Sequence, residues 1–353
     1  MKKNTLLLLI AVAVFLTISV LLLNQPEESG DAERQKLFPK LTGVANEVVA
    51  LEVAGGGDIE GVSLFRKEDR WLVANQNYPA DFEQIKKQLV ALSQATLVEA
   101  KTSNPENYHF LGIEKNAEPG KIQEKLLRLT STDGSVFELI VGKVATGQKG
   151  RYVRRLAEDQ VWLIDQPLEL PVKAKDWLDK KLMNLPSGEV QSITFESKGS
   201  DGYRITREGR GDGLVWLDKP KGESVRHKDS INDLAKLFEN LTLEDVKTAS
   251  AADEDSNRVS YQLFSGIKIV VTSSPDRDRF IQLSLNLEKE ITEKYLPKDV
   301  ELHSYIGDAE KLLQIYRLLL EGRQFEVSQY RLNLMSKTVD DLLAQDEPPA
   351  GSE

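Results

Sequence analysis

Predominantly apolar residues form one long run near the N-terminus. Residues 5–23 hold no charged residue, no glycine and no proline. As an α-helix this run is roughly 28 Å long, about the hydrocarbon thickness of a bilayer. We therefore predict a transmembrane anchor over residues 1–24, followed by a polar, acidic spacer over residues 25–36.

The flanks of this run predict its orientation. Lys2 and Lys3 precede it, and acidic residues follow it closely. Positive residues stay on the cytoplasmic side, so the body lies outside. For a Gram-negative cell, which is an assumption, the expected location is the inner membrane, single-pass, with the body in the periplasm. A cleaved signal peptide is the alternative, but its apolar core is about 7–15 residues long and ends in small residues, which are missing here.

Alternating apolar and polar positions follow the spacer and predict strands over residues 47–53, 61–66 and 71–73. The stripe of Phe82, Ile85, Leu89 and Leu92 then predicts a helix that faces a sheet, with Asp81 as its N-cap. Further strands and hairpins are predicted over residues 96–101, 125–130, 135–141, 151–156 and 160–165.

The same order of elements then starts again. Strand patterns recur at 189–195 and 202–207, a tryptophan recurs at Trp216, and a helical stripe follows at Ile231, Leu234, Phe238 and Leu241. Patterns at 243–247 and 261–271 match the strands that follow the first helix. A recurring order of elements is the sign of a repeat architecture, so we predict a tandem duplication.

The predicted fold class is therefore α+β, with two tandem repeats, each an antiparallel sheet packed by a helix. The first repeat is expected over residues 37–166 and the second over 189–336, joined by a helical linker at 167–188. A helix over 309–323 and a closing strand over 325–334 are expected in the second repeat. The C-terminal tail, 337–353, is expected to be mostly disordered.

Composition narrows the function. Hydrophobic residues make up 40% and charged residues 29% of the 353 positions, which is ordinary for a folded protein. The formal net charge of −10 argues against nucleic-acid binding, since such proteins carry a basic face. The chain has no cysteine, so disulfides, thiolate nucleophiles and cysteine metal ligands are excluded.

The candidate chemical motifs are weak. Residues 142–149 (GKVATGQK) depart from a phosphate-binding loop at the lysine and hydroxyl positions, which favours a plain hairpin loop over nucleotide binding. Residues 253–257 begin like a calcium loop, but Arg258 replaces the required glycine. His109, His227 and His303 are far apart in sequence. We expect no catalytic residue, no cofactor and no metal, and therefore no enzyme.

One local basic cluster stands out at Arg151, Tyr152, Arg154 and Arg155. Its functional interpretation is contact with an anion or a protein partner. Its structural interpretation is pairing with nearby carboxylates. The four tryptophans are interpreted as core residues, because Trp71 and Trp216 hold equivalent places in the two predicted repeats.

Several segments, which we call the landmark residues, together carry a family resemblance. They are Leu37–Leu41, Trp71, Tyr78–Asp81, Lys101–Tyr108, Leu111–Gly112, Gly142–Lys143, Tyr152–Arg154, Val161–Leu163 and Trp177–Asp179. As an ordered set over roughly residues 37–250 they resemble a bacterial family known as domain of unknown function 4340.

The resemblance implies an anchored extracytoplasmic protein, in some cases encoded beside gliding-motility-type ABC transporter components. It brings no catalytic residue. The function expected is a non-enzymatic accessory or scaffold protein of an envelope complex, with a membrane-protein partner and no nucleotide. The alternative is a periplasmic module that binds a polysaccharide or a peptide, with the cleft between the two repeats as the expected site.

Overall fold

The fold consists of two large antiparallel sheets with helices, an α+β architecture, in a computed structural model. The structure describes residues 35–55, 61–114, 124–147, 149–197, 200–227, 229–250, 256–273 and 278–344. Within these residues no helix is both long and apolar enough to cross a membrane. The predicted anchor, 1–24, and nearly all of the spacer lie outside them.

The first sheet has nine strands in the order β4-β3-β2-β1-β6-β7-β8-β9-β5. The strands are β1 (Val48–Gly55), β2 (Val62–Lys67), β3 (Arg70–Val73), β4 (Tyr78–Pro79), β5 (Leu97–Ala100), β6 (Lys125–Ser131), β7 (Val136–Val144), β8 (Arg151–Arg155) and β9 (Val161–Ile164). Their alternation buries one face, as Leu51 and Val53 show in β1.

Helix α3 (Phe82–Gln94) belongs to this first half of the chain. Asp81 is its N-cap, because its carboxylate accepts a hydrogen bond from the Gln84 amide at 3.1 Å. Ile85, at the second position of the predicted stripe, is fully buried, whereas Phe82 in the first turn is exposed.

The second sheet has eight strands in the order β13-β12-β11-β16-β17-β18-β19-β15. They are β11 (Val190–Ser197), β12 (Ser200–Thr206), β13 (Val215–Trp216), β15 (Asp245–Thr248), β16 (Asn257–Leu263), β17 (Ile267–Ser273), β18 (Phe280–Leu287) and β19 (Arg323–Glu326). A separate two-stranded sheet pairs β10 (Lys181–Met183) with β14 (Leu241–Thr242).

The remaining helices are short, except α7 (Leu302–Leu320). The others are α2 (Leu41–Val44), α4 (Tyr108–Leu111), α5 (Ser230–Asp233), α6 (Lys289–Tyr295), α8 (Gln329–Met335) and α9 (Val339–Leu342). The 3-10 helices are η1 (Ala45–Glu47), η2 (Pro105–Asn107), η3 (Ala174–Trp177), η4 (Ser187–Glu189) and η5 (Leu234–Phe238).

The two large sheets have the same strand order once β4 is set aside. Each begins with three strands joined in series and continues with a helical segment (α3, or α5 with η5). The next strand of the same sheet, β5 or β15, then lies at the far edge. In the second sheet α7 separates β18 from β19, whereas the corresponding strands β8 and β9 are joined by a short loop.

Three segments differ from the sequence expectations. Residues 167–188 hold the 3-10 helix η3, strand β10 and the start of η4 in place of a continuous helix, because Pro167, Pro171 and Pro186 interrupt helical hydrogen bonding. The strand expected over 325–334 is β19 followed by helix α8. In the tail, residues 337–344 include helix α9, which a capping box between Thr338 and Asp341 stabilises, and residues 345–353 lie outside the described residues.

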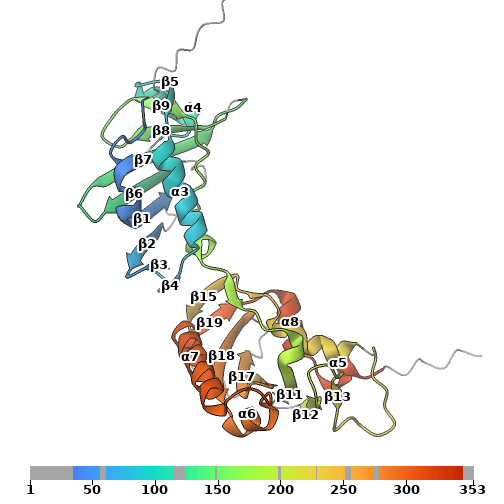
Figure 1. The fold of residues 1–353 in the computed structure, drawn as a ribbon. Helices are drawn as coiled ribbons and strands as arrows, with labels where there is room; N and C mark the ends of the chain where they lie inside the picture. The colour runs from blue at the N-terminus through green and yellow to red at the C-terminus, as the bar shows by residue number, and fades with distance from the viewer. Residues whose placement is uncertain are drawn as a thin grey trace, which may run out of the picture.

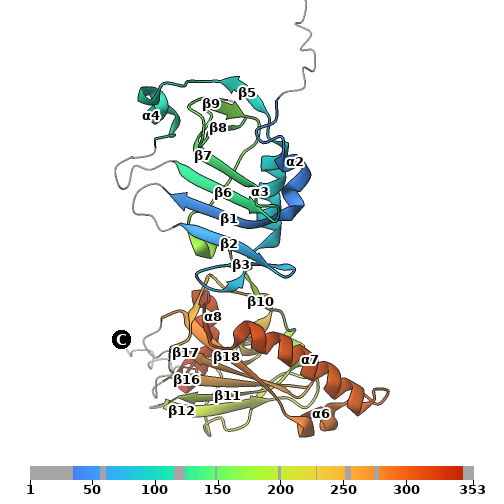
Figure 2. The ribbon, with the colours of Figure 1, turned by 90° about the vertical axis from the view of Figure 1, so that its left-hand side faces the viewer.

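One contiguous apolar core runs through both sheets, from Leu37 to Leu342. Figure 1 and Figure 2 show the two sheets arranged end to end, with the chain crossing near β4 and β10. Trp71, Trp177 and Trp216 are buried in this core, and Trp162 packs against it half-buried. The core therefore continues through the junction between the two sheets.

Candidate functional site

Two landmark segments meet at the junction between the sheets. The backbone amide of Asp81 donates to the carbonyl of Trp177 at 2.8 Å, and the amide of Asp179 donates to the carbonyl of Pro79 at 2.9 Å. The start of α3 is thereby paired with the connecting segment between the two sheets. These landmark residues fix the point where the chain passes from one sheet to the other.

Tyr78 is the central side chain of this junction. It is 1% exposed, and its ring lies 5.9 Å from that of Phe325 in an edge-to-face arrangement. Arg323 lies 5.8 Å from the centre of the same ring and donates to the carbonyl of Asn77 at 3.0 Å. Burial, and then the charge of Asp179, raise the pKa of the Tyr78 phenol well above its usual range. The group is a neutral packing element rather than an acid at physiological pH.

The landmark segment Leu37–Leu41 is fastened to the first sheet by neighbouring side chains. Arg155 donates through Nε to the carbonyl of Leu37 at 2.8 Å and pairs with the carboxylate of Glu158 at 2.8 Å. The ring of Phe38 lies edge-on to Phe137 at 5.4 Å. The arginine is therefore used to hold a backbone segment 118 positions away.

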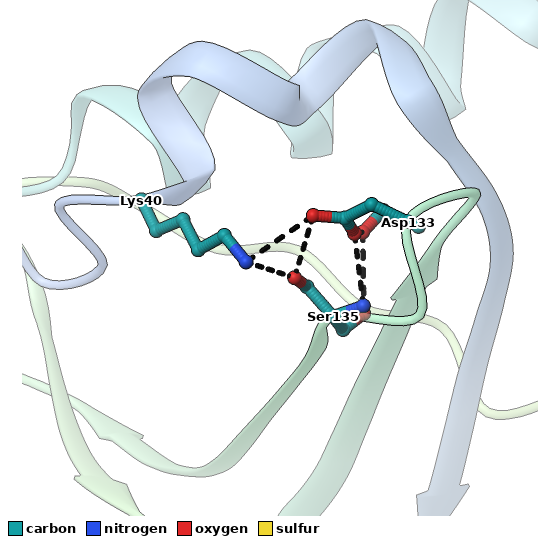
Figure 3. A network of polar contacts seen from close by, with 4 residues as sticks. Lys40, Asp133 and Ser135 are labelled. Carbon is teal, nitrogen blue, oxygen red and sulfur yellow. Dashed lines mark hydrogen bonds and ion pairs between the residues drawn. The ribbon is translucent and has the colours of Figure 1, made fainter.

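Lys40 extends this attachment to the hairpin between β6 and β7 (Figure 3). Its ammonium lies 3.2 Å from Asp133 and donates to the hydroxyl of Ser135. Hydrogen bonds from the Ser131 hydroxyl, then from Ser135, then from Lys40 hold the pKa of Asp133 well below its usual range. The carboxylate stays ionised and organises the turn.

The residues predicted to contact a partner, Arg151, Tyr152, Arg154 and Arg155, belong to β8 of the first sheet. Arg151 donates to the carbonyl of Leu168, and burial lowers its pKa. Arg154 is 9% exposed and stacks over the ring of Tyr108 at 5.2 Å. Tyr152 packs against the small apolar cluster beside α4. The guanidinium groups of the arginine cluster at residues 151–155 thus make contacts within the chain. Contact between this arginine cluster and a protein partner stays a prediction.

The Gly142–Lys143 landmark lies at the end of β7, against α4. A Cβ atom at Gly142 would lie 2.3 Å from the carbonyl oxygen of Leu111, so the helix carbonyl can approach only a glycine. The Lys143 ammonium donates to the carbonyls of His109 and Phe110 at 3.2 and 3.3 Å. A cation at the last carbonyls of a helix is a structural cap.

The titratable residues named in the sequence analysis are dispersed. His109 belongs to α4, His227 lies before α5, and His303 belongs to α7. Within the described residues no three histidine or acidic side chains gather as metal ligands would. Residues 253–255 of the acidic loop lie outside the described residues.

Sequence reasoning missed a hollow on the second sheet. It lies on the face opposite the apolar core and has a volume of about 380 Å³. Polar side chains of β12, β11, β16 and β17 line it, with Glu288 and Ile291 of the α6 region at its rim. The signal was available in alternate positions such as Ser192, Thr194 and Ser260, which are small and polar in strands whose other face is apolar.

Comparison with known proteins gives one match. A family model described as "Domain of unknown function (DUF4340)" matches residues 71–262, more than half of the chain. The matched range runs from β3 to β16 and so includes both sides of the junction. No curated protein and no solved structure matches the chain.

Proposed function

The chain belongs to the DUF4340 family, and on that premise we propose that it is a non-enzymatic, membrane-anchored accessory or scaffold protein of an envelope complex. The observation that supports this most strongly is how the landmark residues are used. At the junction, at the attachment of residues 36–41 and at α4, they hold one part of the chain to another. A body built around such contacts suits a protein that presents surfaces to partners.

We further propose that the two sheets descend from a tandem duplication. The shared strand order supports this origin, as does the repeated order of sequence patterns that includes Trp71 and Trp216. Duplication gives a scaffold two related surfaces held at a fixed separation by the junction.

The proposed location is the inner membrane, with a single N-terminal helix and the body in the periplasm. The apolar run at residues 5–23 and the charges that flank it support this location. The partner we propose is a membrane-protein complex of ABC-transporter type, which rests on the resemblance described above.

Co-purification in a mild detergent tests the scaffold role. The full chain should recover a membrane-protein partner in a fixed ratio. A matched chain in which residues 5–23 are replaced by a leucine helix of equal length should recover the same partner, because the body makes the contact. Recovery of the full chain alone, from membranes that contain all native complexes, would contradict the proposal.

The hollow on the second sheet favours a second candidate function, a periplasmic ligand-binding module. Its volume of about 380 Å³ lies within the range of small-molecule sites, and its polar side chains can form hydrogen bonds to a ligand. This location differs from the cleft between the repeats expected from the sequence. Thermal shift of the full chain against a panel of envelope polysaccharide fragments and peptides separates this candidate from a pure scaffold.

A further inference from the structure

We propose that the hollow on the outer face of the second sheet binds a neutral oligosaccharide. The inference rests on the second candidate function, the ligand-binding module, and does not depend on the scaffold role. Three observations support it: the register of the strands that form the floor, the ion pairs that occupy the equivalent place in the first sheet, and the balance of positive and negative charges in the lining.

The floor is a set of small polar side chains in register across adjacent strands. Thr194 lies opposite Arg204 on one side and Ser260 on the other, and in the next row Ser192 lies opposite Gln262. Among the described residues, the hydroxyls of Ser192, Thr194 and Ser260 have no hydrogen-bond partner within the chain. A hydroxyl both donates and accepts, so these groups can bond the hydroxyls of a sugar in either sense.

The first sheet fills the corresponding place on its own outer face. There Glu52, Arg128 and Glu138 lie directly opposite one another on β1, β6 and β7. Arg128 donates to Glu138 at 2.7 Å and lies 3.6 Å from Glu52, which makes a continuous ion ladder across three strands.

The shared strand order identifies the equivalent positions in the second sheet. In the first sheet, Glu52 follows Leu51 and Arg128 precedes Leu129, and these two leucines form a buried pair between β1 and β6. The equivalent buried pair between β11 and β16 is Ile193 with Tyr261. Counting from these pairs places Thr194, Ser260 and Val270 where the ladder has Glu52, Arg128 and Glu138. The long charged side chains are replaced by short ones, which leaves the hollow.

The rim is positioned by a close contact of α6 with the turn between β16 and β17. Gly266 has a φ of +86°, and a Cβ atom there would lie 1.9 Å from the Thr292 hydroxyl. That hydroxyl donates to the carbonyl of Ser265 at 3.0 Å, which docks α6 on the turn. Ile291 is thereby held at the hollow, where its side chain offers an apolar surface to the C–H face of a sugar ring.

The lining carries charges of both signs that cancel. Arg204 and Lys268 are opposed by Glu196 and Glu288, and the Lys268 ammonium lies 3.3 Å from the Glu288 carboxylate. A charged ligand gains little from a site with no net charge, whereas a neutral ligand with many hydroxyls can pair with every group.

A peptide is the less favourable occupant. Peptides that bind sheets usually add a strand at an open edge, where the main chain forms hydrogen bonds. The hollow lies on a sheet face, between strands that are already paired on both sides. Its side chains, and not its backbone, are offered to the ligand, which favours an oligosaccharide.

Isothermal titration calorimetry on the full chain tests this assignment, in a detergent without a sugar headgroup. The probes are cellotetraose, maltotetraose and the fully N-acetylated chitotetraose, all of them neutral, with tetraalanine as the peptide comparison. The main variant rebuilds the ladder of the first sheet, T194E/S260R/V270E. Its matched control is S284R, which places an arginine on the same sheet face outside the hollow lining.

We expect at least one of the three sugars to bind the unmodified chain with a sub-millimolar Kd. The ladder variant should weaken that binding by at least about tenfold, while S284R leaves it unchanged. If circular dichroism shows that the triple variant does not fold, S260R alone carries the test. The assignment is overturned if none of the sugars binds, if the ladder variant binds as well as the unmodified chain, or if tetraalanine binds and the sugars do not. None of these outcomes bears on co-purification with a membrane partner.

Discussion

At the scale of single residues, Glu124 is a carboxyl group whose buried environment its sequence context does not predict. It precedes β6 and is only 6% exposed, and its Oε2 has no hydrogen-bond partner among the described residues. Burial, and then the charge of Glu114, raise its pKa to about 7, while Arg154 acts in the opposite direction. A glutamate just before a strand gives no hint of this in the sequence, because the burial comes from tertiary packing.

Glu124 makes the stability of the fold depend on pH. Its folded pKa of about 7 is above the unfolded value of 4.5, so its contribution is complete below pH 4.5 and is lost as the pH rises through about 7. We expect E124Q to be more stable than the unmodified chain at pH 8, with a smaller difference at pH 5. Urea unfolding of both proteins at the two pH values measures this. Parallel pH dependence of the two proteins would contradict the assignment.

Gly142 should tolerate no side chain. G142A places a Cβ atom against the Leu111 carbonyl and should lower the free energy of unfolding by about 1–3 kcal/mol, the usual cost of overpacking. Gly43 is the matched control, because a Cβ atom there meets nothing within 4 Å. Chemical denaturation of G142A and G43A decides the point, and equal stability of the two would show that α4 moves aside freely.

At the scale of elements, periodicity was a good guide wherever one face of an element is buried. The spacing of Ile85, Leu89 and Leu92 predicted α3, and alternation predicted β1 and β7, because burial on one side imposes these periods. The prediction of a helical linker over residues 167–188 was wrong, because prolines and the buried Trp177 override the short apolar pattern. The partners of the arginine cluster could not be predicted, since they are backbone carbonyls remote in sequence.

The attachment of residues 36–41 to the first sheet should depend on Arg155. R155M removes the charged donor to the Leu37 carbonyl, and hydrogen bonds to charged groups contribute about 1.5–3 kcal/mol. We expect faster amide hydrogen exchange in residues 36–41, with little change in α3. K86M is the control, because Lys86 is exposed and, among the described residues, pairs with Glu83 alone. Unchanged exchange in the R155M variant would show that the other contacts hold the segment without this bond.

At the scale of the whole molecule, the sequence patterns predicted antiparallel sheets with helices, but neither the order of the strands within each sheet nor the placement of the two sheets. That placement depends on Tyr78, Phe325 and the bond from Arg323 to Asn77, which spans 246 positions. Local patterns carry no information about such contacts. The hollow was missed for a related reason, because it needs the registers of four strands at once.

The junction should make the two sheets unfold together. Calorimetry of the unmodified chain should show one cooperative transition, because one core runs through both sheets. Y78A removes the central ring at a cost of about 3–5 kcal/mol, the usual range for a buried aromatic, and should separate the transition into two. Y78F keeps the ring and is the control. A Y78A variant that melts like Y78F would contradict a role for this ring in coupling the sheets.

The most direct test of the account is where the full chain resides and on which side its body lies. Membranes should retain the chain after an alkaline wash, with the residues before Gln25 still present by N-terminal sequencing. Protease added to spheroplasts should digest the body while a cytosolic marker stays intact. Recovery of the chain from the soluble fraction without residues 1–24, or a body that protease reaches only after lysis, would contradict the membrane-anchored scaffold.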